Sequence, residues 1–188
     1  MTTSKIIEKI VNDQIIDYFN SNKLFSKFQF GFRSKHNTQD ANNLLLETIY
    51  THLNSKSNVA VIFIDLKKAY DSINIDLLLK KLQHYKLDPT SLKWFNSYLR
   101  NRTQSVVIGD HISDPLSTTV GIPQGSVLGP TLFNIFINDF EFSHKALSIQ
   151  YADDTSLIIE NKNFNELESS ANQNLSSNAL WLAANCLS

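Results

Sequence analysis

Hydrophobic positions follow two periods along the chain, and their succession predicts the order of the elements. Helical spacing of apolar residues marks positions 5–19, 38–53, 75–85, 90–99, 131–140 and 164–182. Short apolar or alternating runs, typical of strands, occupy positions 59–64, 104–108, 115–120, 147–151 and 157–159. This order predicts an α+β fold, with helices packed on one face of a small, mainly antiparallel sheet.

Polar residues and prolines set the expected helix starts. Thr38 is expected to cap the second helix, and either Ser72 or Asn74 the third. Thr90 is expected to begin the fourth helix, and Pro130 fits the first turn of the fifth, where its missing N–H costs nothing.

The run from 59 to 64, Val-Ala-Val-Ile-Phe-Ile, is continuously apolar and ends at Asp65. A strand that is apolar on both faces is typical of the buried centre of a sheet. The sequence therefore predicts a central strand with a carboxylate at its carboxyl end, where active sites of such sheets tend to lie.

Two adjacent acids, Asp153 and Asp154, lie between the β-prone runs 147–151 and 157–159. This arrangement predicts a β-hairpin with both carboxylates at its tip. Neighbouring carboxylates between buried strands repel each other unless a cation lies on them, which indicates a divalent metal site. An exposed acidic turn is the alternative interpretation.

Composition is that of a globular protein of one domain, or one domain and a small lobe. The 188 residues are 42% hydrophobic and 19% charged, which argues against disorder. The single cysteine, Cys186, excludes an internal disulfide and suits a reducing compartment. The longest apolar run is too short to cross a bilayer and no secretory leader is expected, so we predict an intracellular protein without a membrane partner.

Charge is divided unevenly along the chain, although the net charge is only -1. Residues 1–102 carry 15 of the 17 Lys and Arg residues and nine acids, a balance of +6, whereas residues 103–188 sum to -7. The asymmetry suggests a cationic half that meets a polyanion and an acidic half that holds cations. A chance distribution of surface charge is the alternative.

Asp65, Asp153 and Asp154 converge if the hairpin pairs beside the first strand. Three hard oxygen donors without a nearby His or Cys suit Mg²⁺ or Mn²⁺ better than zinc. Carboxylates around two such ions carry out phosphoryl or nucleotidyl transfer. At this point a polymerase, a nuclease and a phosphatase all remain open.

Three motifs, in order, resemble the central motifs of reverse transcriptases, most closely those of non-LTR (LINE-type) retrotransposons. They are Phe-Ile-Asp-Leu-Lys-Lys-Ala-Tyr-Asp at 63–71, Gly-Ile-Pro-Gln-Gly-Ser-Val-Leu-Gly-Pro at 121–130 and Tyr-Ala-Asp-Asp at 151–154. Gln-Phe-Gly-Phe-Arg at 29–33 resembles the fingers segment of the same group, and residues 181–187 resemble the helix end after the Asp-Asp hairpin. The resemblance covers about residues 24–188. It implies a partial fingers-like helical segment over 1–58 and a polymerase palm over 59–188, with the thumb absent.

The resemblance also implies roles for individual residues. Asp65 and Asp153 would bind two Mg²⁺ or Mn²⁺ ions, Asp154 would complete the site, and the backbone carbonyl of Leu66 would be a further ligand. Tyr70 falls where the family places the ring that excludes a 2′-hydroxyl. These residues form the expected catalytic centre.

Substrate contacts follow from the same resemblance. Gln124 and Gly125 would contact the incoming nucleotide, and Arg33 the triphosphate, since a guanidinium can bind phosphate oxygens in pairs. Lys35 and Tyr151 are expected to touch nucleic acid. The implied partners are an RNA template, a DNA primer and deoxynucleoside triphosphates; the protein would work in the nucleus or the cytoplasm.

The chain departs from the family pattern in its extent, because upstream fingers segments, the thumb and any endonuclease segment are missing from it. Two functions therefore stay open: an RNA-directed DNA polymerase domain, or a catalytically silent retrotransposon remnant that acts as a nucleic-acid-binding or structural domain. A carboxylate nuclease is a third interpretation, against which the Gln124 loop and Tyr70 argue.

Overall fold

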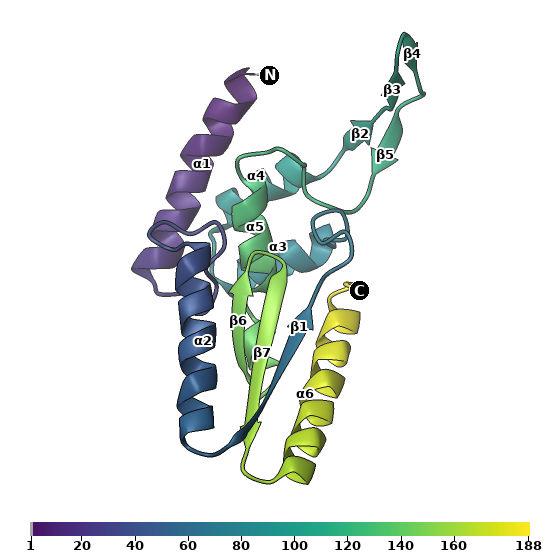
Figure 1. Ribbon diagram of the computed structural model, residues 1–188. Coiled ribbons are helices and arrows are strands. Elements are labelled where there is room, and N and C mark those ends of the chain that lie inside the picture. Colours follow the sequence, from purple (N-terminus) through teal and green to yellow (C-terminus); the bar gives the residue numbers. More distant parts are fainter. Residues whose placement is uncertain (1) are drawn as a thin grey trace.

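The structure is a computed structural model that describes residues 2–188 (Figure 1). Its elements are, in order, α1 (Thr2–Ser21), α2 (Thr38–Asn54), β1 (Asn58–Ile64), α3 (Ile75–His84), α4 (Pro89–Leu99), β2 (Arg102–Gln104), β3 (Val107–Ile108), β4 (His111–Ile112), β5 (Leu116–Thr118), α5 (Gly129–Ile137), the 3₁₀ turn η1 (Phe140–Phe142), β6 (Leu147–Tyr151), β7 (Asp154–Asn161) and α6 (Phe164–Ala184). The predicted α+β order of helices and hairpins is confirmed.

The main sheet has three antiparallel strands in the order β1-β7-β6. The prediction that the apolar run 59–64 forms a buried central strand is therefore wrong. β7 takes the centre, and β1 is an edge strand of intermediate exposure in which Phe63 is 73% exposed. A continuous apolar run shows that a strand can be buried on both faces, but strand order depends on pairing with distant residues.

Both faces of β7 are covered, not one as predicted. On one face Ile158 packs with Ile149 of β6 and with Ala41 of α2. Leu157 and Ile159 point to the opposite face, because neighbouring side chains of a strand alternate, and they are also buried. α2 therefore covers one face, while α6 lies against β1 and β7 (Figure 1).

The larger core surrounds α5, in which every residue except the half-buried Pro130 is buried. A helix that is apolar on all sides is stable only when other elements enclose it. Here α1, α3 and α4 supply the surrounding layer, with buried residues that include Ile15, Phe19, Leu78, Leu82, Phe95 and Leu99. This core supports the loop that precedes α5 and the turn that follows β1.

Helix starts follow capping chemistry, with two shifts from the predicted residues. Asn37, not Thr38, caps α2, in a capping box with Asp40. Asn74 caps α3 as one of the two predicted candidates. α4 begins at Pro89 rather than Thr90, because Asp88 accepts from the backbone N–H groups of the first turn.

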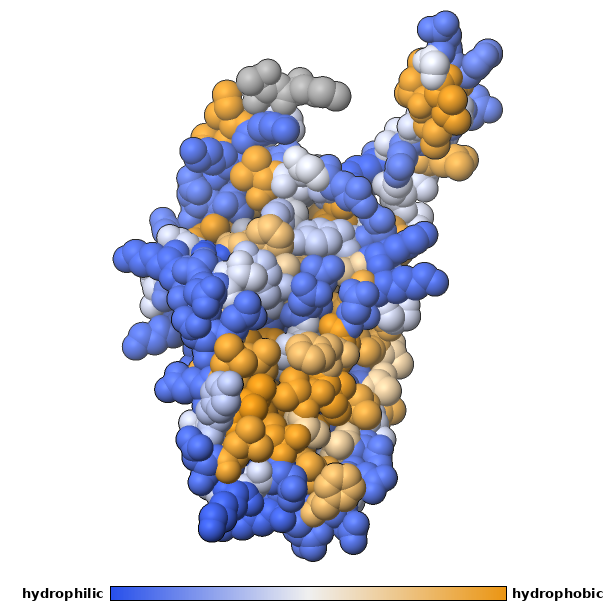
Figure 2. All heavy atoms as spheres, viewed as in Figure 1, coloured by the Kyte–Doolittle hydropathy of each residue, from blue (hydrophilic) through white to orange (hydrophobic). Residues whose placement is uncertain are grey.

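A β-arm, residues 102–118, projects from the body (Figure 1). It is built from two short ribbons, β2 with β5 and β3 with β4. Apolar side chains gather on it in Figure 2, among them Val107, Ile108 and Ile112, which are 64%, 73% and 71% exposed. Among the helices of residues 2–188, none is long and apolar enough to cross a membrane.

Candidate active site

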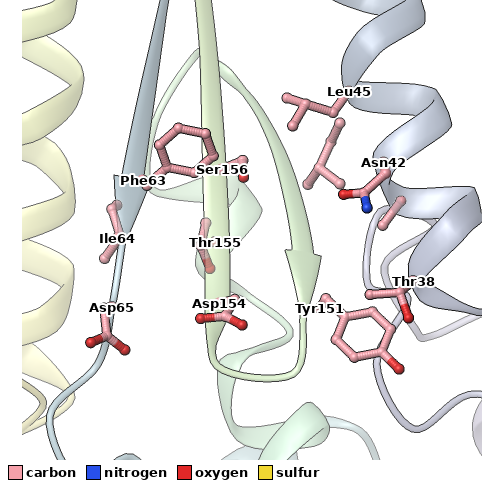
Figure 3. Close-up of a pocket in the computed structure, with 12 residues that line it drawn as sticks. Thr38, Asn42, Leu45, Phe63, Ile64, Asp65, Tyr151, Asp154, Thr155 and Ser156 are labelled. Atoms are coloured by element: carbon pink, nitrogen blue, oxygen red, sulfur yellow. The ribbon is translucent and has the colours of Figure 1, made fainter.

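Asp65 directly follows β1 and Asp154 begins β7, at the same end of the main sheet. The β1–β7 register ends with Ile64 opposite Thr155, and its continuation by one residue brings Asp65 opposite Asp154. Side chains of directly opposed residues point to the same face. Figure 3 shows both carboxylates at this end of the sheet, with Tyr151 beside Asp154. Asp65 and Asp154 are exposed, so solvent reaches both.

Asp153 belongs to a two-residue turn with Ala152, since Tyr151 pairs with Asp154. Ala152 has a φ of 57°, a positive value at the first loop position, as primed hairpin turns require. The prediction that both acids sit in the turn is half right: Asp153 does, whereas Asp154 is the first residue of β7. Asp153 is half-buried.

The donor set suits a hard divalent cation, because Asp65, Asp153 and Asp154 offer only oxygen atoms. Within residues 2–188, however, no three His, Cys, Asp or Glu side chains stand together as a complete metal-binding group. The structure therefore brings Asp65 and Asp154 to the same end of the sheet, with Asp153 next to Asp154 in the chain, and the convergence of all three carboxylates stays a prediction.

Tyr70 lies in the turn region after β1, and its ring stacks on Phe133 of α5 with centroids 4.7 Å apart and planes at 21°. Burial, and then the charge of Asp153, raise the pKa of the Tyr70 phenol to about 12. The contribution of Asp153 links the Tyr70 hydroxyl electrostatically to the hairpin tip.

The loop before α5 is bonded to the same turn. Gly121 N donates to Ile73 O at 2.8 Å, and Ile122 N donates to Tyr70 O at 3.1 Å. Gly121 has a φ of 81°, and a Cβ there would lie 2.9 Å from the carbonyl oxygen of Asp71, so only glycine allows this approach.

The same loop brings the predicted nucleotide contacts together. Gln124 Nε2 donates to Asp71 Oδ1 at 2.7 Å, which orients the exposed amide. Tyr70, Gln124 and Gly125 line one hollow, together with Phe32. The structure thus assembles in one place residues of the loop before α5 and a tyrosine more than 50 positions earlier in the sequence.

Arg33 does not line this hollow. Its Nη1 donates to the carbonyl oxygens of Ser26 and Gln29, and its guanidinium lies over the Phe25 ring, 5.1 Å from the centroid. Arg33 and Lys35 line a different hollow, without Tyr70 or Gln124. The contacts of Arg33 hold the loop 25–29, and the structure does not bring it to the Tyr70 hollow.

The other predicted residues occupy two places. Tyr151 lines the hollow of Figure 3, between the sheet and α2, together with Asp65 and Asp154. The half-buried side chain of Leu66 packs against the larger core, directly after Asp65. Lys67 N then donates to Ser188 O at 2.7 Å, so the end of the described chain lies beside this segment.

Sequence reasoning assigned no role to three residues that support the site: Gln29, Asp71 and Asn134. Asp71 holds Gln124. Gln29 and Asn134 are each 1% exposed and bond backbone groups around the hairpin tip. Polar residues inside otherwise apolar segments were the available signal, but their partners are more than 100 positions away.

The fold and this arrangement of carboxylates define a class. The profile of the reverse transcriptase (RNA-dependent DNA polymerase) family matches residues 1–185, so the chain belongs to this family. The resemblance to non-LTR retrotransposon enzymes drawn from its motifs is confirmed by its relatives, which are named as RNA-directed DNA polymerases.

Two relatives come from Drosophila melanogaster. The probable RNA-directed DNA polymerase from transposon BS is 30% identical over 187 residues, which are 95% of this chain and 20% of the relative. The RNA-directed DNA polymerase from mobile element jockey is 30% identical over 167 residues, 84% of this chain and 18% of the relative. The chain thus spans about a fifth of the length of the curated relatives it matches.

Solved structures share the fold. Apo telomerase from Candida tropicalis superposes with a TM-score of 0.64 at 15% identity, over 98% of this chain and 39% of the telomerase chain. Telomerase from Candida albicans, in complex with a fragment of telomeric RNA, gives 0.58 at 12% identity, over 90% of this chain and 32% of that one. These likenesses support the predicted palm with part of the fingers.

Proposed function

We propose that this chain is the catalytic part of an RNA-directed DNA polymerase that extends a DNA primer on an RNA template. The observation that carries the proposal is the β1–β7 register, which ends with Ile64 opposite Thr155, so that Asp65 comes next at the same end of the sheet as Asp154 and its neighbour Asp153. The hollow lined by Tyr70 and Gln124 adds a place for a deoxynucleoside triphosphate. The Candida albicans telomerase, which shares the fold, is in complex with a fragment of telomeric RNA, and this is consistent with an RNA template here.

Asp65, Asp153 and Asp154, with the carbonyl of Leu66, would hold two Mg²⁺ or Mn²⁺ ions. Such ions, when bound, activate a primer 3′-hydroxyl and neutralise the charge of the triphosphate. The protein's own residues orient the reactants. The Tyr70 ring, supported by Phe133, would form the floor under the sugar and exclude a 2′-hydroxyl, and the Gln124 amide, held by Asp71, would contact the nucleotide.

Nucleic-acid contacts are proposed for Lys35 and Tyr151, which line two different hollows. Lys35 is exposed in the hollow next to Arg33, and Tyr151 faces the hollow between α2 and the sheet. A cation suits a template phosphate, and an aromatic ring suits a base or sugar.

A second function is a catalytically silent domain that binds nucleic acid or acts structurally. One observation favours it: no complete three-ligand group stands among the described residues 2–188.

The test compares residues 1–188 with the double variant Asp153→Asn/Asp154→Asn, by primer extension on poly-A and by Mn²⁺ binding. Asp110→Asn/Asp114→Asn is the matched control, because it removes two exposed acids from the β-arm with the same change in net charge. We expect the first pair to abolish both Mn²⁺ binding and extension, and the control to retain them. Extension that survives in Asp153→Asn/Asp154→Asn would refute the assignment; Mn²⁺ binding without extension would favour the silent domain.

A further inference from the structure

The segment from Phe28 to Gly31 runs along the free side of β6. Phe30 N donates to Gln150 O at 2.8 Å, and Gln150 N donates to Phe28 O at 2.9 Å. The two segments form a short parallel bridge between Gln29 and Gln150. This pairing brings the fingers-like motif of residues 29–33 to the tip of the Asp153 hairpin.

The Gln29 side chain binds both backbone polar groups of Ala152. Its Oε1 accepts from Ala152 N at 3.1 Å and from Gly31 N at 2.8 Å, and its Nε2 donates to Ala152 O at 3.2 Å. Gln29 is 1% exposed and Ala152 is 6% exposed, so water does not replace these bonds. Satisfying the backbone of Ala152 in this way requires a donor and an acceptor on one side chain.

Ala152 needs such support because its φ of 57° lies in the left-handed region, which its Cβ disfavours. Two other residues hold the Gln29 side chain against the Ala152 turn. A Cβ on Gly31 would lie 2.1 Å from Ala152 N, so the two backbones touch only because residue 31 is glycine. Asn134 of the buried helix α5 donates from Nδ2 to Gly31 O at 2.7 Å, and this bond connects residues 29–31 to the core.

We infer that Gln29 is a positioning residue for the catalytic hairpin: its amide fixes the Ala152 turn, and through it the carboxylates of Asp153 and Asp154. The inference rests on the proposed function, since it assigns these carboxylates a metal to bind. Residues that orient metal ligands through hydrogen bonds typically affect metal affinity or activity by roughly 10–100-fold. Gln29 acts through backbone atoms of Ala152 and touches neither carboxylate in the contacts described.

The test uses Gln29→Met in residues 1–188, because methionine has a similar length without hydrogen-bonding groups of comparable strength. The matched control is Asn174→Leu. Asn174 is also a buried amide that bonds backbone groups, since its Oδ1 accepts from Lys145 N and Ala146 N at 3.0 Å each. It belongs to α6, and its described bonds go to Lys145, Ala146 and Ser170 rather than to Ala152.

Two measurements are made on both variants and on the wild type: hydrogen exchange of the Ala152 amide by NMR, and Mn²⁺ affinity. In Gln29→Met we expect exchange at Ala152 to rise by roughly tenfold or more, and Mn²⁺ affinity to fall by roughly 10–100-fold. In Asn174→Leu we expect both the exchange rate of the Ala152 amide and the Mn²⁺ affinity to stay within about twofold of the wild type, even if its melting temperature falls as much as that of Gln29→Met. Gln29→Asn, which keeps the amide but shortens its reach, serves if Gln29→Met does not fold, with losses in the same direction.

Unchanged Ala152 exchange in a folded Gln29 variant would overturn the inference, and so would equal losses in Asn174→Leu. The inference would also be overturned if a Gln29 variant kept the wild-type Mn²⁺ affinity while Asp153→Asn/Asp154→Asn abolished Mn²⁺ binding. A wild type that does not bind Mn²⁺ would instead refute the proposed metal site, and Ala152 exchange would then decide alone whether Gln29 positions the turn.

Discussion

Replacement of Tyr70 by Phe tests the environment of the ring at the proposed nucleotide site. The substitution keeps the stack on Phe133 and removes only the hydroxyl. That hydroxyl is buried, and in the described part of the chain it has no hydrogen-bond partner. The folded protein favours the neutral phenol of Tyr70. The contribution of this group to the free energy of unfolding is therefore complete below pH 10 and is lost as the pH rises toward 12.

The magnitude follows from the shift of the pKa from 10.0 to about 12. At about 1.36 kcal/mol per pKa unit the full effect would be about 2.7 kcal/mol. Tyr70 is only half-buried, so solvent screening reduces this to about 1.3 kcal/mol, of which about half is reached by pH 11. Between pH 9 and pH 11 the free energy of unfolding of Tyr70→Phe should therefore rise by about 0.7 kcal/mol relative to that of the wild type.

The assay is urea denaturation followed by circular dichroism at several pH values in this range. Tyr50→Phe is the control, because it removes the same hydroxyl group from a side chain that is 61% exposed. Parallel stability curves for wild type and Tyr70→Phe would refute the reasoning, since they would mean that neither burial nor Asp153 disfavours the phenolate.

Two further predictions concern the site and its support. Tyr70→Val should raise the ratio of ribonucleotide to deoxynucleotide incorporation in primer extension by roughly 10–100-fold, whereas Tyr70→Phe should leave it unchanged; equal ratios in all three proteins would exclude Tyr70 as the steric gate. Lys81→Met should lower the free energy of unfolding by about 2 kcal/mol in urea denaturation, because Lys81 Nζ donates to Phe136 O at 2.6 Å and Asp139 Oδ1 at 2.7 Å, and both acceptors would be left without it. An unchanged or increased stability would contradict the second prediction.

Local chemistry predicted much of this protein from the sequence. Hydrophobic spacing located the six α-helices of residues 2–188 and the Asp-Asp hairpin, because the period of a single element depends on near neighbours. The motifs around Asp65, Gln124 and Asp153 indicated the family, which was confirmed. The starts of α2 and α4 differ by one position from the prediction, since adjacent polar residues compete for the same N–H groups.

Only the tertiary structure decided which distant residues meet. An apolar run cannot show whether a strand lies at the centre or the edge, so β1 was misplaced while β7 took the centre. A sequence cannot reveal that Arg33 bonds the loop before it, or that the amide of Gln29 reaches Ala152 across 123 positions. Motifs specify the chemical groups, whereas strand pairing and core packing determine which of those groups share a site and which hold it in place.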